Sequence, residues 1–175
     1  MIVVSNTSPL TNLAAIGQFN LLHELYGEVH IAQGVWSELN AGGQHWPGSD
    51  EVAAADWVHR HNVGNQALVV ALQQDLDRGE AETIALALEL GADLTLMDEK
   101  EGRHAAQRMG LQVAGVIGVL IEAKGQGLVE SVQPHLDRLR RTAGFYISEK
   151  LYRYAMEMAE ETDQYRTEGY GLSNL

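Results

Sequence analysis

The stretch GEAETIALALELGADLTLMDE, residues 79–99, contains the clearest change of hydrophobic pattern in this sequence. Apolar residues in its first half recur at spacings of three and four, which predicts an amphipathic helix over residues 79–90. They are Ala81, Ile84, Ala85 and Leu88. Gly91 stands where a helix C-terminus favours glycine, and residues 94–97 form a short apolar run typical of a buried strand. A helix that leads through a glycine into such a strand is the repeating unit of an α/β protein.

The same alternation continues on both sides of this stretch. Further strands are predicted at residues 2–4, 29–31 and 111–113, with a short edge strand at residues 57–58. A helix is predicted after Ser8, which is expected as its N-cap before Pro9. Further helices are predicted at residues 19–25, around 35–39, at 67–72 and 99–109, and after Ser131 and Ser148. The glycine-rich residues 41–50 predict a loop. Strands that alternate with helices predict a three-layer α/β/α fold with a central parallel sheet of four to five strands.

The domain organisation follows from length and pattern. A chain of 175 residues is long enough for one domain with its own hydrophobic core. We expect a single domain over residues 1–175, with a core of about residues 1–125 and a helical extension of about residues 126–161. Residues 162–175 show no periodicity and predict a frayed tail.

Composition excludes several classes of protein. The chain has no cysteine, which rules out disulfide scaffolds, thiolate zinc sites and cysteine nucleophiles. The first basic residue is Arg60, so no charged leader is expected, and the longest uncharged apolar run, residues 111–121, is too short to cross a bilayer. We therefore expect a soluble, cytoplasmic protein with no membrane partner. A net charge of −12 also argues against a basic footprint for nucleic acid over the whole surface.

Polar residues follow two of the predicted strands. Asn6 ends the first strand, and Asp98 ends the strand at residues 94–97. Ligands of parallel sheets bind outside the carboxyl ends of the strands, and two helices carry acids towards the same region, Glu38 on one and Glu80 with Glu82 on the other. Such a set of oxygen donors suits Mg²⁺ or Mn²⁺. A metal of this kind polarises a phosphodiester and activates water.

Each of these residues also has a structural interpretation. Asp98 with Glu101 fits a helix capping box, and Glu80 with Glu82 fits the first turn of a helix, where carboxylates are favoured. Glu38 fits a solvated helix position. Asn6 fits an Asx turn before its helix.

Six short fragments occur in order along about residues 1–125. They are VVSNTSPL (3–10), VWSEL (35–39), GEAETIALA (79–87), LTLMDE (94–99), GRHAA (102–106) and GVIGVL (115–120). Together they resemble the PIN-domain nucleases, specifically the VapC-like toxin ribonuclease branch of predicted nucleic-acid-binding proteins. The resemblance implies a hydrolase that holds Mg²⁺ or Mn²⁺ on conserved acids and cuts RNA.

The resemblance also assigns site residues. The second family acid matches Glu38, the fourth matches Asp98, and the third matches Glu80, with Glu82 as a near competitor. The first family acid, an aspartate, falls on Asn6, so three carboxylates remain and weaker metal binding is expected. A neutral amide cannot act as a general base, although it can orient a water ligand.

Partners follow from the same resemblance. The hydroxyls of Thr7 and Ser8 and the guanidinium of Arg103 are expected to contact the RNA substrate. A small antitoxin protein with a basic segment is the expected protein partner, and a homodimer is the expected assembly. The alternative is a catalytically inactive PIN-like module that binds RNA or such a protein, and an unrelated small-molecule binder is a weaker third interpretation.

Two further patterns have no place in this site. His59 and His61 share one face of the predicted edge strand, but the neighbouring sequence offers no third ligand, so they are interpreted as surface histidines. The C-terminal helix has an apolar stripe that indicates core or dimer packing. The stripe consists of Leu151, Tyr154, Ala155 and Met158.

Overall fold

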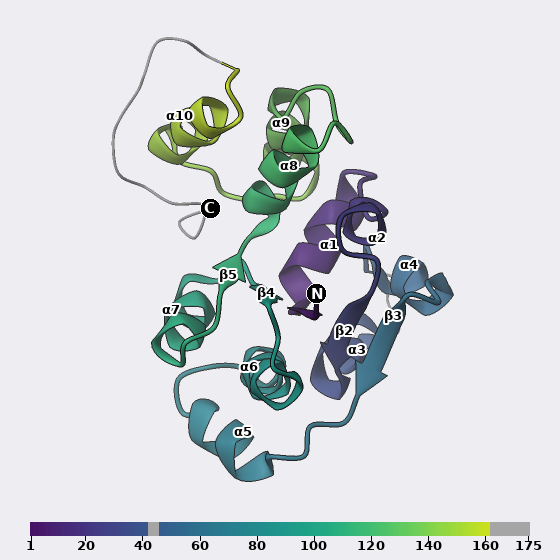
Figure 1. Cartoon of the computed structure of the whole chain (residues 1–175), viewed down its shortest axis with the longest axis vertical. Helices are drawn as coiled ribbons and strands as arrows, with labels where there is room; N and C mark the ends of the chain where they lie inside the picture. Colours follow the sequence, from purple (N-terminus) through teal and green to yellow (C-terminus); the bar gives the residue numbers. More distant parts are fainter. Residues whose placement is uncertain (42–45, 162–175) are drawn as a thin grey trace.

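The computed structural model describes residues 1–41 and 46–161, and in this part of the chain it contains a five-stranded, all-parallel sheet (Figure 1). The strand order is β3-β2-β1-β4-β5. The strands are β1 (Val3–Ser5), β2 (Val29–Ala32), β3 (Val58–His61), β4 (Leu94–Leu96) and β5 (Val113–Ala114). The predicted α/β/α fold with four to five parallel strands is confirmed, and β3 lies at one edge of the sheet as expected.

Helices occupy the connections between strands and the C-terminal part of the chain. They are α1 (Thr7–Ala15), α2 (Leu21–Tyr26), α3 (Gln33–Leu39), α4 (Ser49–Ala54), α5 (Gln66–Leu72), α6 (Arg78–Leu90), α7 (Lys100–Arg108), α8 (Val116–Gly125), α9 (Gln133–Thr142) and α10 (Glu149–Met158). In Figure 1, α8, α9 and α10 lie at the top of the view and α5 and α6 at the bottom, with the sheet between them.

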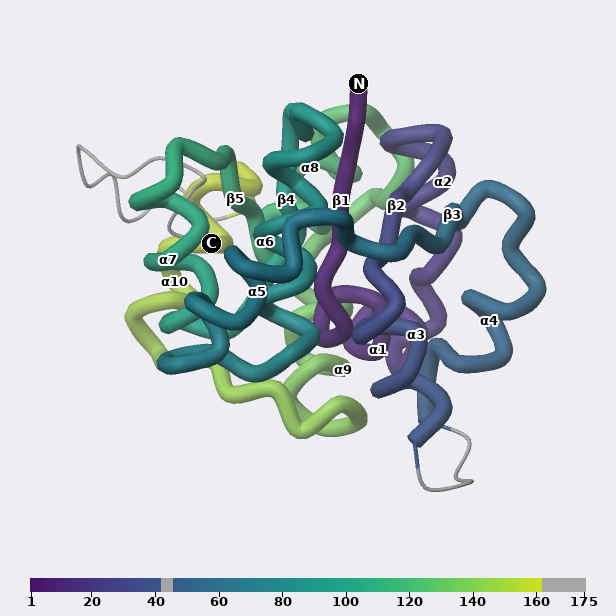
Figure 2. Tube along the Cα trace, turned by 90° about the horizontal axis from the view of Figure 1, so that it is seen from below, coloured from purple at the N-terminus to yellow at the C-terminus, as the bar shows by residue number. Residues whose placement is uncertain are grey.

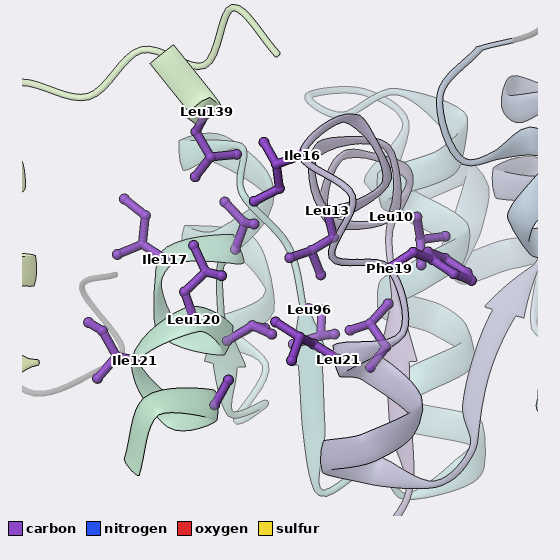
Figure 3. Close-up of a cluster of buried hydrophobic side chains, with 14 of the residues drawn as sticks. Leu10, Leu13, Ile16, Phe19, Leu21, Leu96, Ile117, Leu120, Ile121 and Leu139 are labelled. Carbon is purple, nitrogen blue, oxygen red and sulfur yellow. The ribbon is translucent and has the colours of Figure 1, made fainter. Parts of the chain in front are cut away.

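The alternation of strand side chains explains this layering. Val3, Ile31 and Leu96 belong to a large apolar cluster with α1, α2 and α8 to α10, whereas Val4 and Ala32 belong to a second cluster with α5, α6 and α7. Figure 3 shows side chains of α1, β4, α8 and α9 that point toward one another in the larger cluster. Both faces of the sheet are therefore covered, as the apolar strands require.

The C-terminal helices pack on the same core. Leu136 and Leu139 of α9 and Ala155 of α10 are buried in the larger cluster. The remaining members of the predicted α10 stripe are partly buried against it, namely Leu151, Tyr154 and Met158. Core packing, one of the two interpretations of this stripe, is therefore observed. Residues 162–175, predicted as a tail, lie outside the described residues.

Some local predictions were wrong. Helix α1 begins at Thr7 with Asn6 as its N-cap, so Ser8 is not the cap. Helix α4 begins inside the predicted loop of residues 41–50 and continues beyond it, after Gly48, whose φ is a positive 95° and which is the N-cap. The helix predicted from residue 79 begins at Arg78, and Gly91 ends it with φ 63°, as expected. None of the helices in the two described ranges is long and apolar enough to span a bilayer.

The strand order determines where a ligand site can form. The chain builds β2 and β3 on one side of β1 and then β4 and β5 on the other. The order therefore reverses between β1 and β4, which is where open parallel sheets leave a crevice at their carboxyl ends. The Asn6 backbone N–H donates to the Leu96 carbonyl oxygen at 2.9 Å and joins the two strand ends. In Figure 2, β1 leads into α1 at the same end of the sheet as α3.

Candidate active site

Asn6 lies between the ends of β1 and β4, at the point of the sheet where this crevice is expected. Its side chain is only 3% exposed, and its Oδ1 atom is buried without a hydrogen-bond partner. Asn6 makes no side-chain capping bond to α1, so the Asx-turn interpretation is wrong. A buried amide oxygen without a donor carries a desolvation cost of about 1–3 kcal/mol, which calls for a physical explanation.

Glu38 reaches the crevice from α3. Its carboxylate accepts a hydrogen bond from the Thr7 hydroxyl, so it is not a freely solvated helix residue. Gly79 at the start of α6 leaves the space for this carboxylate, since a Cβ at that position would lie 2.8 Å from Glu38 Cδ. Burial raises the pKa of Glu38, and the nearby Asp77 and Glu82 carboxylates raise it further, against the hydrogen bonds from Thr7 and the Gly79 backbone.

Glu80 lies one turn into α6 and forms a capping box with Asp77. The Glu80 N–H donates to Asp77 Oδ1 at 2.8 Å, and Glu80 Oε2 accepts from the Asp77 N–H at 3.1 Å. The structural interpretation of Glu80 is therefore confirmed in part, because one of its oxygens is used by the helix. Burial raises the pKa of Glu80, and the Asp77, Glu99 and Glu38 carboxylates add to this rise.

Glu82 is held in place by two donors. Its Oε2 accepts from the Gly34 N–H of α3, and its Oε1 lies 3.2 Å from the Arg78 Nε. A side chain on Gly34 would collide with this carboxylate, whose Cδ would be 3.1 Å from the added Cβ. Glu82 is 3% exposed and links α3 to α6. These contacts favour Glu80 over Glu82 as the acid that faces the crevice.

Asp98 follows β4 and binds donors from two helices. Its Oδ1 accepts from the Val116 N–H at 2.8 Å, and its Oδ2 accepts from Asn12 Nδ2 at 3.3 Å. The predicted capping box with Glu101 is wrong, because Glu99 is the N-cap of α7 and no side chain caps this helix. Burial raises the pKa of Asp98 to about 6, although the two hydrogen bonds and the charge of Arg103 act in the opposite direction.

The three residues predicted to contact substrate all lie near these acids. Thr7 binds Glu38, and the Ser8 hydroxyl lies 3.4 Å from Glu99 Oε1. The Arg103 guanidinium donates to the Met97 carbonyl oxygen at 3.0 Å. In this structure the three side chains therefore contact the walls of the crevice, and Thr7 and Ser8 orient carboxylates.

Sequence reasoning missed three residues of this region. Asn12 binds Asp98, Asp77 caps α6 beside Glu38 and Glu80, and Glu99 accepts from Ser8. The sequence D-R-G-E at residues 77–80 has the spacing of a capping box and signals Asp77. Nothing in the sequence pairs Asn12 with Asp98, because that contact joins α1 to the end of β4.

The chemistry of the donors fits a divalent cation. Asn6 offers an oxygen without a donor, and Glu38, Glu80 and Asp98 have raised pKa values that a nearby positive charge would lower. In residues 1–41 and 46–161, no three His, Cys, Asp or Glu side chains are grouped as ligands of one ion. Mg²⁺ is commonly bound by one or two carboxylates and several waters, so one or two of these carboxylates with the amide suffice.

The fold and this crevice define a class of protein, a parallel α/β/α domain with an acidic, oxygen-rich site at the point where its strand order reverses. A family model described as a PIN domain matches residues 2–161, and the chain belongs to this family. PIN domains are nuclease-like modules that bind nucleic acid and generally use divalent metal ions. No curated protein matches the sequence significantly.

Proposed function

We propose that this chain is a metal-dependent endoribonuclease of the VapC-like branch and hydrolyses phosphodiester bonds of RNA in the cytoplasm. The observation that carries the proposal is the buried Oδ1 of Asn6, which has no hydrogen-bond partner and lies at the reversal point of the sheet. A bound ligand that accepts a lone pair from the Asn6 Oδ1 would explain why this buried oxygen has no hydrogen-bond donor. The family and the surrounding acids make a divalent cation the ligand of choice.

Asn6 would hold the ion together with one or two of the three carboxylates of Glu38, Glu80 and Asp98. The bound ion would supply Lewis-acid polarisation of the phosphodiester and a more acidic water. The chain's own residues prepare the site. The Thr7 hydroxyl orients Glu38, Asn12 and the Val116 N–H orient Asp98, and the Asp77 backbone fixes one oxygen of Glu80.

Arg103 is proposed to bind an RNA phosphate. Its guanidinium extends along the end of β4 to the Met97 carbonyl, next to Asp98. Thr7 and Ser8 would add hydroxyl contacts from the first turn of α1. In a chain of net charge −12, the Arg103 guanidinium beside Asp98 would give a local site for a phosphate without a basic surface.

The test is cleavage of mixed RNA in the presence of Mn²⁺ by the wild-type protein and by Asp98→Asn, which keeps the size of the side chain. We expect cleavage by the wild type that chelation of the metal abolishes and that falls at least about a hundredfold in the variant. Equal cleavage by the two proteins would mean contamination and would overturn the proposal.

Asn6→Asp is the companion variant, because it restores the charge of the missing family acid. We expect Mn²⁺ affinity to rise about tenfold or more, measured by calorimetry, since affinity for hard cations follows ligand charge. Asn62→Asp, at an exposed position, is the matched control and should leave the affinity unchanged. An unchanged affinity in Asn6→Asp would place Asn6 outside the metal's ligand set.

The second candidate is an inactive PIN-like module that binds RNA or a small antitoxin-type protein. Asn6 favours it, because the amide cannot replace the carboxylate as a base. The acidic crevice would then bind a basic segment of the partner through Glu38 and Asp98. RNA binding without Mn²⁺-dependent cleavage, in both the wild type and Asn6→Asp, would support this candidate over the first.

A further inference from the structure

Three histidines stand together on one face of the sheet, away from the acidic crevice. His30 of β2 is the register partner of His59 of β3, and His61 lies two residues further along β3 on the same face. The sequence shows only the pair on β3. The third imidazole comes from β2, and it overturns the expectation that no third ligand lies near.

The ring of His30 is in contact with each of the other two. His30 Nδ1 lies 2.8 Å from His61 Nε2, and the His30 ring centroid is 5.0 Å from that of His61 and 5.4 Å from that of His59. His59 Nε2 is buried without a hydrogen-bond partner, although Glu28 Oε1 lies 3.3 Å away. Two ring nitrogens at 2.8 Å can share only one proton, so at least one of them presents a lone pair to the other.

The environment keeps this pair neutral. Burial lowers the pKa of His30, and His61 and His59 lower it further, against the charge of Glu28. Burial and His59 lower the pKa of His61, against the charge of Glu89. Both shifts favour the neutral imidazole, in which one ring nitrogen carries a lone pair, and a change of tautomer can direct that lone pair to a ligand.

We propose that His30 and His61 bind a borderline divalent transition-metal ion of the Zn²⁺ class, with His59 as the third ligand. Imidazole favours Zn²⁺, Ni²⁺ and Cu²⁺ over the hard cations that carboxylates prefer. A pair of strand histidines two residues apart and a third on the neighbouring strand can place three imidazoles around one ion, and three histidines are a known zinc ligand set.

Binding requires a small opening of the His30–His61 pair and a turn of the His59 ring. With Zn–N bonds of about 2.0–2.1 Å in a tetrahedral site, two ligand nitrogens lie about 3.3 Å apart, so the His30–His61 pair opens by about half an ångström. His59 must turn from Glu28 toward the pair, because no three such side chains are already grouped for metal binding in the described ranges. All three histidines are half-buried and therefore accessible from solvent.

This site goes beyond the proposed nuclease function. It lies on the two strands at one side of the sheet, whereas the acidic crevice lies between β1 and β4. A bound ion would connect the edge strand β3 to β2 through side chains in addition to the backbone ladder. The ion would then stabilise an edge that is otherwise paired on one side only.

The test is calorimetric titration of the untagged protein with Zn²⁺ alone at pH 7.5, together with thermal unfolding with and without Zn²⁺. We expect a site of micromolar affinity and a rise in Tm on addition of Zn²⁺. His30→Gln and His61→Gln should each weaken Zn²⁺ binding at least about tenfold and remove the rise in Tm, and His59→Gln should weaken it severalfold. His104→Gln, at an exposed helix position, is the control and should bind as the wild type does, and Asp98→Asn should keep the histidine site while losing any Zn²⁺ that the acids bind.

Several outcomes would overturn the proposal: no Zn²⁺ binding, equal binding by His61→Gln, or loss of binding in Asp98→Asn, which would assign the ion to the acids. Equal binding by His59→Gln would refute the third ligand. A second measurement tests the proposal without any variant, in case a variant fails to fold. In the wild-type protein, Zn²⁺ should shift the imidazole NMR signals of His30, His59 and His61 and leave that of His104 in place.

Discussion

At the scale of single residues, the crevice depends on glycines that leave room for carboxylates. Gly79 lies against Glu38, and Gly102 lies against Glu80, whose Oε1 would be 3.2 Å from an added Cβ. The nearest atoms at Gly79 belong to the flexible end of an acidic side chain, whereas the nearest atom at Gly102 is the Sδ of the buried Met97, 2.5 Å from the added Cβ. A methyl group at Gly79 would therefore move a carboxylate more readily than it would disturb the fold, whereas one at Gly102 would also press on the core.

Gly79→Ala tests this argument. We expect the Cβ to push the Glu38 carboxylate away from Thr7 and to lower Mn²⁺ affinity about tenfold, as measured by calorimetry. The free energy of unfolding should change by less than about 1 kcal/mol, because alanine is the better helix former. Gly125→Ala is the matched control, since nothing lies within 4 Å of its added Cβ. If both variants bound Mn²⁺ as the wild type does, the position of Glu38 would have no bearing on the site.

A pH dependence follows from Asp98, whose pKa is raised to about 6 from an ordinary value of 3.8. The folded protein binds this proton more tightly than the unfolded chain does, so protonation favours the fold. The stabilisation is complete below about pH 4 and is lost as the pH rises through 6, and it amounts to at most about 3 kcal/mol.

Urea unfolding between pH 4 and pH 8 without divalent cations measures this effect. Asp98→Asn lacks the titrating group, so its free energy of unfolding should increase relative to that of the wild type as the pH rises. For Asp56→Asn, at an exposed position, the free energy of unfolding should change with pH in the same way as that of the wild type. A constant difference between Asp98→Asn and the wild type across the range would contradict the raised pKa.

At the scale of elements, the first turn of α6 has two tasks. Asp77 caps the helix through its contact with the Glu80 N–H, and its charge raises the pKa of both Glu38 and Glu80. The helix terminus therefore contributes to the electrostatics of the crevice. The two tasks can be separated, because asparagine caps helices about as well as aspartate does.

Asp77→Ala and Asp77→Asn make this separation. We expect Asp77→Ala to lower the free energy of unfolding by about 1 kcal/mol and Asp77→Asn to change it by less than half as much. Both variants should lower the pKa of Glu38 and Glu80 toward ordinary values, as followed by carboxyl NMR signals. Equal destabilisation by the two variants would contradict the capping role.

The elements themselves were largely predictable, because their signals are local. Helix α6 was recognised from its apolar spacing and Gly91, and the short strands were recognised from runs such as residues 94–97. Helix α4 was missed because glycine and proline dominate its approach. The role of Asp98 as a helix cap was wrong because D-x-x-E is a local pattern, whereas its real donors, Asn12 and Val116, are far away in the chain.

At the scale of the whole molecule, strand order creates both candidate sites. Because β1 lies beside β4, Asn6 at the end of β1 is bonded to the end of β4, just before Asp98. Because β2 lies beside β3, His30 contacts His61. The sequence predicts the strands but not which of them are neighbours, since that choice depends on the packing of all layers. The acids could therefore be named from the sequence and the resemblance, while the histidine cluster could not.

The C-terminal helices should unfold together with the sheet, although the sequence presents them as an extension. Glu161 connects them to α8, because it accepts from the Ser131 hydroxyl at 2.9 Å and the Gln133 N–H at 3.1 Å and lies 3.1 Å from Lys124 Nζ. These donors lower the pKa of Glu161 even though burial acts to raise it. The charged form is therefore favoured in the fold, and its stabilisation is present above the ordinary pKa of 4.5 and lost as the pH falls.

Glu161→Gln should lower the free energy of global unfolding by about 1–3 kcal/mol at pH 7, with one cooperative transition in urea and no change in its slope. The difference from the wild type should shrink at low pH, where both side chains are neutral. Glu130→Gln, at an exposed position, is the control and should leave the midpoint unchanged. If Glu161→Gln instead speeded hydrogen exchange in α9 and α10 alone and left the global midpoint in place, the C-terminal helices would be a separate folding unit. Because Leu136, Leu139 and Ala155 are buried in the same cluster as Val3 and Leu96, the whole midpoint should move.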